Sequence, residues 1–258
     1  MSTNKRYDGG LIVTDCPSQS AKVIQSSFRN FLYQPRAYQK NYLQKNFTQA
    51  FDGYSYLGQK DSSNQYETDL LHSFVISGLS PIHKYPTEFQ SFLINDWKIL
   101  TQLVRALEKE VIETLDIPGL SVFHDRHMDH MVSCNYYPAL DQLKNRAGLD
   151  LRLSRHKDVS LFSVFIFGID DGLSYEIESG EQKRLGQRSR VVIFPGYFLE
   201  LISGGKYKAV EHQVELPKDN VERYSFAFFS IPKPESKIDF AGLELTGESY
   251  YEQYLNLF

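Results

Sequence analysis

The chain has 258 residues with 41% hydrophobic and 23% charged side chains, the composition of a globular protein that can bury a sizeable core in one domain. Its formal net charge of -4 gives no electrostatic reason to expect nucleic acid as a partner. Two cysteines, Cys16 and Cys134, cannot form a disulfide framework. Residues 1–19 lack an apolar signal core, and the sequence contains no run of about 18 apolar residues that could cross a membrane. We therefore expect a cytoplasmic protein, by default a monomer.

The first elements are predicted to be helical. Residues 20–48 carry apolar side chains at helical spacing, and Pro35 interrupts the pattern. Residues 50–86 are rich in Gly, Ser, Asn, Tyr and Pro, which indicates a loop with a strand or two.

A long helix is predicted to begin near Thr87, where Thr87 and Gln90 have the spacing of a capping box. Its apolar side chains recur at steps of three and four, stop before residues 117–119, and indicate a helix that packs against the core. Residues 124–130, which follow, are dense in histidine and aspartate. We interpret them as a polar loop; a second metal site, for example for zinc, and a side chain that lines a substrate pocket are the alternatives.

From residue 131 onward the pattern is typical of strands separated by turn signals. Helices followed by many short strands predict an α+β, mainly β fold: a β-sandwich or barrel with the helices packed outside. Tyrosines near the C-terminus predict a short amphipathic helix that covers the open end of the barrel or packs on its surface. The predicted strands cover residues 131–137, 159–167, 173–177, 190–194, 207–214 and 224–231.

A candidate metal site begins with His156-Lys157-Asp158. On an extended segment, residues i and i+2 point to the same face, so His156 and Asp158 would point together while Lys157 points away. His212 lies on a later predicted strand. Two imidazoles and one carboxylate form a facial triad that suits iron(II) and leaves positions open for a chelating substrate and O2. We therefore predict that His156, Asp158 and His212 are the metal ligands and catalytic residues.

A candidate anion subsite involves Arg223 and Ser225, which share one strand face. A guanidinium beside a hydroxyl can hold a carboxylate by several hydrogen bonds. Tyr137 could donate a phenol hydrogen bond to the same anion, and Asn135 could add an amide contact on the same face. Each of these patterns is common by itself, and only their order and spacing together are specific.

These motifs resemble the isopenicillin N synthase-like branch of the 2-oxoglutarate/iron(II)-dependent oxygenases. The resemblance is strongest over residues 131–234, and the part before it fits more loosely. The residues that carry it are Asn135-Tyr136-Tyr137-Pro138, His156-Lys157-Asp158, Gly172-Leu173, the stretch to His212 with Gly196, Leu199, Ser203, Gly205, Tyr207 and Lys208, and Arg223-Tyr224-Ser225 followed by Phe228, Phe229 and Pro232.

The resemblance implies a double-stranded β-helix, or jelly-roll, core. It implies one domain over residues 1–258, with a helical N-terminal part (1–120), the core (121–234) and a tail (235–258). It also implies that Fe(II) is bound by the triad, and that 2-oxoglutarate is held by Arg223 and Ser225 with help from Tyr137 and near Asn135. The implied reaction uses O2, converts 2-oxoglutarate to succinate and CO2, and hydroxylates a C–H bond of a small molecule, with desaturation, cyclisation or demethylation as variants.

Three departures from the family pattern, Ser160, Tyr197 and Gln213, leave the ligands in place and indicate an unusual substrate pocket. We expect Phe165, Tyr197 and Phe229 near that pocket, with a specialised metabolite or an amino acid derivative as the substrate. Two alternatives stay open: an iron-dependent oxidase of the same fold that does not use 2-oxoglutarate, and an inactive barrel that only binds.

Overall fold

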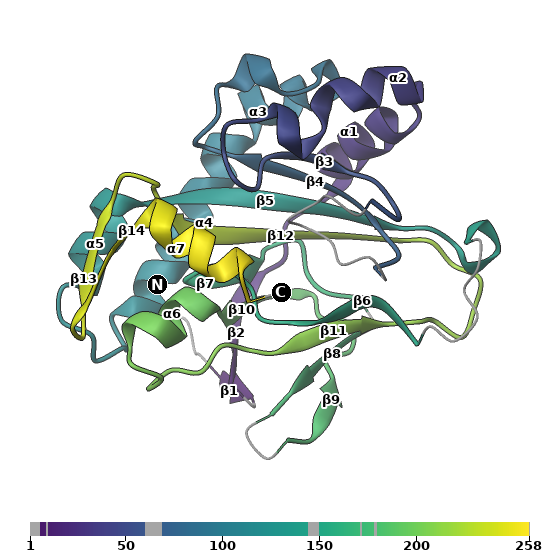
Figure 1. Cartoon of the computed structure of the whole chain (residues 1–258). Coiled ribbons are helices and arrows are strands. Elements are labelled where there is room, and N and C mark those ends of the chain that lie inside the picture. Colours follow the sequence, from purple (N-terminus) through teal and green to yellow (C-terminus); the bar gives the residue numbers. More distant parts are fainter. Residues whose placement is uncertain are drawn as a thin grey trace.

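A large antiparallel β-sheet runs through the middle of the computed structural model, which describes residues 6–8, 10–59, 69–143, 150–170, 172–177 and 180–257 (Figure 1). Residues 60–68 of the predicted loop therefore lie outside the described part. Within that part the sheet has eight strands, in the order β1 (Arg6–Asp8), β2 (Leu11–Pro17), β10 (Arg190–Pro195), β7 (Phe162–Phe165), β12 (Arg223–Pro232), β5 (Met128–Tyr137), β4 (His72–Ser77) and β3 (Gly53–Ser55).

A smaller antiparallel sheet lies below the large one in Figure 1. A separate ribbon of β13 (Lys237–Phe240) and β14 (Leu243–Thr246) follows the last strand of the large sheet. Two antiparallel sheets that face each other form the jelly-roll core, so the predicted α+β, mainly β fold is confirmed. In the described residues the order of the smaller sheet is β6 (Leu151–His156), β11 (His212–Glu215), β8 (Leu173–Glu176) and β9 (Gln182–Arg184).

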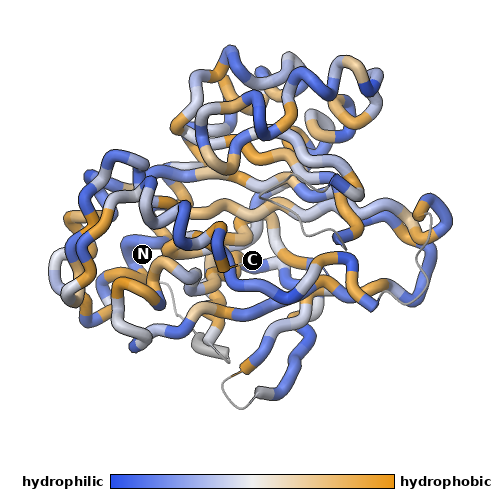
Figure 2. The backbone as a smooth tube through the Cα atoms, viewed as in Figure 1, coloured by the Kyte–Doolittle hydropathy of each residue, from blue (hydrophilic) through white to orange (hydrophobic). Residues whose placement is uncertain are grey.

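Central strands of the large sheet are buried on both faces. On β10, Val191 and Ile193 belong to the hydrophobic core beneath the helices, whereas Val192 and Phe194 belong to a second core between the two sheets. Side chains alternate between the faces of a strand, so a strand covered on both faces reads as a continuous apolar run. Figure 2 shows this hydrophobic character along the middle strands. The second core brings the two sheets together and forms the base on which the site described below is built.

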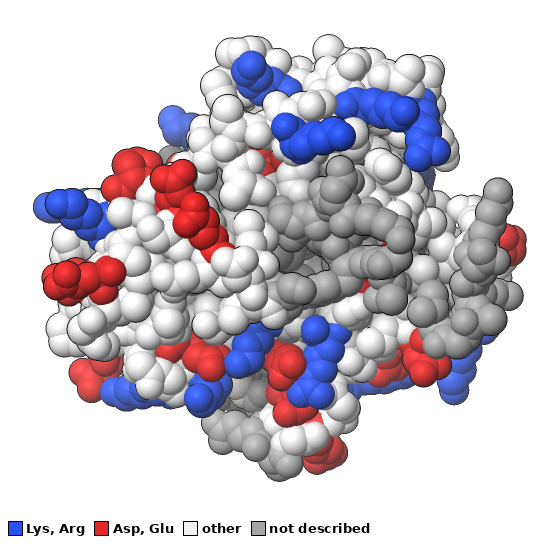
Figure 3. Space-filling model, viewed as in Figure 1, with Lys and Arg blue, Asp and Glu red and all other residues white. Residues whose placement is uncertain are grey.

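Helices pack outside the sheets, as predicted. Figure 1 shows α1, α2 and α3 above β3 and β4, and α5, α6 and α7 near one end of the sandwich. On the face seen in Figure 3, basic side chains gather over the α1–α2 layer, and both signs mix along the lower edge. The helices are α1 (Lys22–Leu32), α2 (Arg36–Gln39), α3 (Gln90–Asn95), α4 (Trp97–Ile112), α5 (Leu120–His127), α6 (Tyr197–Ile202) and α7 (Gly247–Leu255).

The predicted long helix is in fact two helices, α3 and α4, which meet at Asp96. Its predicted capping box is wrong as well. Thr87 begins a 3-10 turn, and the amide of Gln90 donates to the carbonyls of Ile82 and Tyr85 instead of capping a helix N-terminus. The side chain of Gln90 satisfies carbonyls of the preceding turn, a partner that spacing alone does not reveal.

Several strand predictions needed correction in length or number. The predicted strand at 207–214 begins only at His212, because Val210 donates its backbone N–H to Pro195 and Ala209 donates to the Glu200 side chain. The N-terminal strands β1 and β2 were missed. β2 pairs with β10 far along the chain, so the partner that makes it a strand is not visible locally. The division of the chain into three parts stays a prediction, and the first part supplies four strands to the large sheet in addition to its helices.

Candidate metal centre

Two histidines lie directly opposite each other on the smaller sheet. His156 ends β6, His212 begins β11, and the two residues are register partners whose ring centroids are 4.4 Å apart. Asp158 follows His156 by two residues. Its Oδ1 lies 3.4 Å from Nε2 of His156, and its Oδ2 lies 3.7 Å from Nε2 of His212. The three ligand atoms therefore converge on one point, which is the arrangement that a shared metal ion requires.

Each imidazole of this group is oriented by its other ring nitrogen. Nδ1 of His156 donates to the carbonyl of Ser154 at 2.8 Å, and Nδ1 of His212 donates to the carbonyl of Val210 at 3.1 Å. A backbone acceptor on Nδ1 leaves Nε2 as the lone-pair nitrogen, which is the usual support for a histidine that binds a metal. Ser163 donates its hydroxyl to Oδ2 of Asp158 at 2.5 Å and holds the carboxylate from the large sheet.

The charge state of the group also fits a divalent cation. Burial would raise the pKa of Asp158, but the imidazoles of His212 and His156 hold it at about 2, so the carboxylate is ionised. Burial lowers the pKa of His212 to about 4, and its ring is neutral at pH 7. At His156, burial also disfavours the cation, but Asp158 outweighs it and raises the pKa. Two imidazoles and one carboxylate are a donor set typical of non-haem iron(II) sites.

The predicted anion subsite lies on two neighbouring strands of the large sheet. Arg223 of β12 is the register partner of Tyr137 of β5, and Ser225 is the register partner of Asn135. Directly opposed residues share one face of a sheet, so all four positions lie together. The guanidinium carbon of Arg223 lies 4.9 Å from the centroid of the Tyr137 ring. The geometry therefore places side by side the four residues that the sequence singled out as a carboxylate subsite.

Arg223 itself has a free hydrogen-bonding position. Its Nε donates to Asp170 at 2.7 Å, but its buried Nη1 has no hydrogen-bond partner among the described residues. Burial raises the pKa of Tyr137 to about 12, so the phenol keeps its proton and remains a donor. A buried carboxylate must accept hydrogen bonds to be stable in a protein interior. The unpaired guanidinium nitrogen of Arg223 and the neutral phenol of Tyr137 are donors that could supply them.

A second buried arginine was missed from the sequence. Arg152 lies on β6, and its Nη2 donates to the carbonyls of Pro138 and Val221. It borders, together with Arg223, a cavity of about 260 Å³. The signal was present: Arg152, Ser154 and His156 alternate along one strand, and residues two apart share a face.

The three residues expected near the substrate pocket lie in different surroundings. Phe165 is buried between the sheets and packs against Phe194, whose ring is 5.3 Å from that of His212. Phe229 is half-buried and contacts the same core. The ring of Tyr197 instead lies against tyrosines of α7. Phe165 thus reaches the metal centre through one intervening ring, and a contact with substrate stays a prediction for all three residues.

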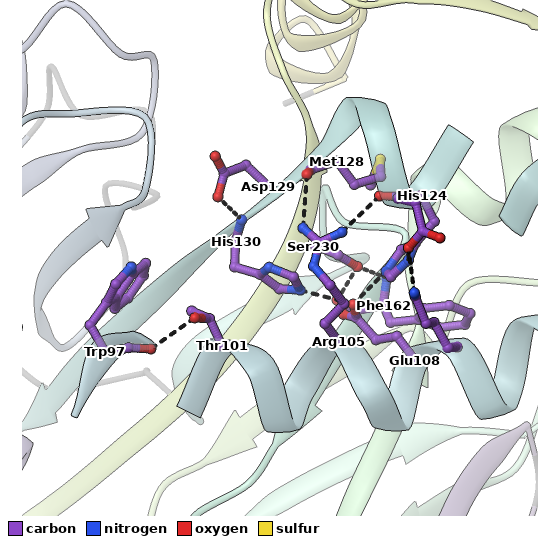
Figure 4. A network of polar contacts seen from close by, with 12 residues as sticks. Trp97, Thr101, Arg105, Glu108, His124, Met128, Asp129, His130, Phe162 and Ser230 are labelled. Atoms are coloured by element: carbon purple, nitrogen blue, oxygen red, sulfur yellow. Dashed lines mark hydrogen bonds and ion pairs between the residues drawn. The ribbon is translucent and has the colours of Figure 1, made fainter. Parts of the chain in front are cut away.

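A second ligand-rich cluster joins α4, α5 and β5 (Figure 4). Oε2 of Glu108 accepts hydrogen bonds from Nε2 of His124 at 2.8 Å and from Nε2 of His130 at 2.9 Å, and all three side chains are buried. The predicted polar loop at 124–130 is therefore wrong, since these residues end a helix and begin a strand. His124 and His130 are buried there because the carboxylate of Glu108 accepts from Nε2 of each ring.

The cluster of Glu108, His124 and His130 differs from the triad in the hydrogen bonds that its histidines make through Nδ1. Nδ1 of His124 has no hydrogen-bond partner among the described residues, whereas both triad histidines donate from Nδ1 to a carbonyl. Both rings of the cluster also contact the same carboxylate oxygen at ordinary hydrogen-bond distances. The geometry favours a hydrogen-bonded core cluster over the zinc alternative.

The comparisons with known proteins agree with the site. Residues 128–232 match the model of the 2OG-Fe(II) oxygenase superfamily, a segment that holds His156, Asp158, His212 and Arg223. The chain is 27% identical to scopoletin 8-hydroxylase of Arabidopsis thaliana over 57% of its own length and 39% of that protein. It is 27% identical to feruloyl CoA ortho-hydroxylase 2 of the same plant over 66% of its own length and 47% of that protein. The chain thus spans about half the length of these curated relatives.

Similar solved structures show the same fold. A full-length protein of Neurospora crassa, in complex with alpha-KG and 5-formyluracil, matches 97% of this chain and 86% of its own with a TM-score of 0.74 and 20% identity. JOX2, in complex with 2OG, Fe and JA, matches 95% of this chain and 78% of its own with a TM-score of 0.68 and 18% identity. Within the described residues, no helix combines the length and apolar composition needed to cross a membrane.

Proposed function

We propose that this chain, whose residues 128–232 match the model of the 2OG-Fe(II) oxygenase superfamily, is an Fe(II)- and 2-oxoglutarate-dependent oxygenase that hydroxylates a C–H bond of a small molecule. The observation that carries the proposal is the convergence of His156, Asp158 and His212, with both Nδ1 atoms bound to carbonyls and both Nε2 atoms directed at the carboxylate. When bound there, Fe(II) supplies the redox chemistry that couples decarboxylation of 2-oxoglutarate to oxidation of the substrate.

The chain's own residues have separate roles in this proposal. His156, Asp158 and His212 would hold Fe(II), which would supply the redox chemistry of the reaction. Arg223 and Ser225 would bind the distal carboxylate of 2-oxoglutarate, and Tyr137, on the neighbouring strand, would donate to the same group. Asn135 accepts a hydrogen bond from Ser133 at 3.1 Å and would lie near the bound cosubstrate. The unpaired Nη1 of Arg223 supports a bound carboxylate at this subsite, and Tyr137 beside Arg223 favours 2-oxoglutarate over the substrate carboxylate that the oxidase alternative would bind there.

The substrate is proposed only by class. Names of the relatives describe hydroxylases of scopoletin and feruloyl CoA, so an aromatic specialised metabolite suits the proposal. The aromatic side chains of Phe165, in the core between the sheets, and of Phe229, which packs against that core, would suit such a substrate. Cytoplasmic location, the monomeric state and the absence of a nucleic-acid partner stay predictions from composition.

Anaerobic titration of the apo-protein with Fe(II) and then 2-oxoglutarate, followed by visible absorption, tests the proposal. We expect a weak metal-to-ligand charge-transfer band that is absent in His156→Ala and His212→Ala. The control His127→Ala, which removes a histidine from outside the triad, should keep the band. Iron binding without a band would favour the oxidase, and a wild-type protein that binds no iron would overturn the assignment of the triad.

A further inference from the structure

The C-terminal helix α7 presents three buried tyrosines to the rest of the protein. Tyr250 and Tyr254 donate their hydroxyls to the carbonyls of Val159 and Lys157, at 2.5 Å and 2.6 Å. Tyr251 donates to the carbonyl of Pro232 instead. Two hydroxyls of the helix therefore hold the backbone on either side of Asp158, the only carboxylate of the triad.

Helix α6 supplies the other half of this support. Its first backbone N–H groups donate to the carbonyls that the tyrosines leave free, so that each carbonyl from 157 to 161 has a donor. A loop whose carbonyls are all paired has little freedom to move, and this loop sets the position of Asp158. The α6 bonds run from Tyr197 N–H to Asp158 at 2.7 Å, from Phe198 N–H to Ser160 at 3.1 Å, and from Gly196 N–H to Leu161 at 3.0 Å.

Close backbone contacts at their N-terminal ends fix the positions of α6 and α7. A Cβ atom at Gly196 would lie 2.0 Å from the carbonyl oxygen of Ser160, and a Cβ atom at Gly247 would lie 2.2 Å from that of Lys233. Only glycine permits this approach at the start of each helix. Thr246 caps α7 by accepting from the backbone N–H of Ser249. The tyrosines thus come from a helix whose position is fixed independently of the metal site.

We propose that Tyr250 and Tyr254 are positioning residues for the metal centre: through the carbonyls of Lys157 and Val159 they hold Asp158 where it can share an ion with His156 and His212. This inference rests on the proposed function, because it requires that the triad binds a metal. Any buried phenol needs an acceptor, and Tyr251 finds one at Pro232, outside the ligand loop. Tyr250 and Tyr254 instead use the two carbonyls that flank Asp158. The tail of the chain is then part of the metal site without contacting the ion.

Fe(II) affinity of hydroxyl-deletion variants tests this inference. Tyr250→Phe, Tyr254→Phe and the double variant keep the rings and remove only the hydrogen bonds to the ligand loop. Tyr251→Phe is the matched control, because its hydroxyl comes from the same helix but bonds outside that loop. The dissociation constant would be measured anaerobically by competition with a colorimetric chelator, and the melting temperature of each apo-protein would be recorded beside it.

We expect the double variant to bind Fe(II) about 10-fold more weakly, the lower end of what loss of outer support costs a metal site. Tyr251→Phe should bind within about two-fold of wild type, while its melting temperature falls about as much as that of either single variant, because each of these three proteins loses one buried hydrogen bond. The Co(II)-loaded double variant should also show an altered visible spectrum, because a displaced Asp158 changes the coordination. A purely structural role would lower the melting temperature alone.

Two results would overturn the inference, and a third would overturn its premise. Wild-type affinity in the double variant, with binding abolished in His212→Ala, would remove the positioning role and leave the proposed function intact. An equal loss of affinity in Tyr251→Phe would show that α7 acts only through general stability. Equal and negligible Fe(II) binding by wild type and His212→Ala would overturn the proposed function and the positioning role with it.

Discussion

Arg223 combines burial with an unpaired nitrogen, which makes it the most informative single residue outside the triad. We expect Arg223→Met to raise the dissociation constant for 2-oxoglutarate by about 100-fold, since losing one partner of a buried charge pair costs about 2–5 kcal/mol. Arg184→Met is the control, because Arg184 borders the same cavity but is exposed. Calorimetric titration of each Fe(II)-loaded variant would measure its dissociation constant for 2-oxoglutarate. Equal dissociation constants in Arg223→Met and wild type would contradict the assignment of Arg223 to the carboxylate subsite.

Glu108 is a fully buried carboxylate that two histidines hold in place. We expect Glu108→Gln to lower the free energy of unfolding by about 3 kcal/mol, because an amide cannot accept both N–H groups with the strength of a carboxylate. Urea unfolding at pH 7 would measure the loss. The exposed Glu113→Gln at the end of the same helix should be neutral, and a neutral Glu108→Gln would mean that the cluster does not stabilise the fold.

The same carboxylate predicts a direction for the pH dependence of stability. Burial would raise the pKa of Glu108, but His130 and His124 outweigh it and hold it at about 2, below the ordinary value of 4.5. A depressed folded-state pKa contributes stability that is fully present above 4.5 and is lost as the pH falls toward 2. We expect the stability gap between wild type and Glu108→Gln to close over that range in urea unfolding series. A difference in unfolding free energy that does not change with pH would contradict this role of the Glu108 carboxylate.

At the scale of elements, the start of α6 controls the loop that carries Asp158. Gly196→Ala would place a Cβ against the carbonyl of Ser160, a backbone atom that cannot rotate away. We expect α6 to shift, the Tyr197–Asp158 hydrogen bond to weaken, and the Fe(II) dissociation constant to rise about 10-fold. Gly204→Ala is the control, since its Cβ meets nothing within 4 Å and adds only the strain of a positive φ. Equal Fe(II) dissociation constants in Gly196→Ala and Gly204→Ala would show that close packing of α6 does not affect metal binding.

Elements also differ in how far their ends could be predicted. β12 is longer than predicted by one residue at each end and β5 begins three residues earlier than predicted, because the two strands pair with each other over ten residues. The strand predicted at 159–167 is reduced to β7, since the carbonyls before it are taken by α6 and α7. Apolar periodicity is present in both cases. The end of a strand depends on which partner uses its hydrogen bonds, and that partner lies elsewhere in the chain.

At the scale of the whole molecule, the site joins the two sheets. The triad lies at β6 and β11 of the smaller sheet, whereas Arg223, Ser225, Tyr137 and Asn135 lie on the large one. Ligands that bind across both sheets should therefore stabilise the whole fold. At 100 times the dissociation constant the gain is about 2.7 kcal/mol, which is about 5–10 °C in melting temperature for a chain of this size.

Scanning calorimetry with Fe(II) and 2-oxoglutarate, under nitrogen, would measure this gain. We expect the shift in wild type and its absence in His156→Ala, whose apo-form should melt close to the wild-type temperature. The same shift in both proteins would mean that the ligands bind somewhere other than the triad.

The sequence by itself determined the fold class and which residues would meet. Its apolar runs between turn signals indicate strands. The order of His156-Lys157-Asp158, His212 and Arg223-Tyr224-Ser225 is informative because a metal triad admits few residue types. The roles of the site residues stay predictions, but the structure brings the triad together and pairs Arg223 with Tyr137 and Ser225 with Asn135.

Only the tertiary structure decided what supports the site. The sequence predicted a short amphipathic helix with Tyr250 and Tyr254, yet their hydroxyls bond to carbonyls more than ninety residues away, at Val159 and Lys157. His124 and His130 were predicted to lie in a polar loop for the same reason, because their partner Glu108 lies on another helix. A buried polar group is stable only with its partner, and where that partner is distant in the chain, no local pattern can show whether a residue is buried or exposed.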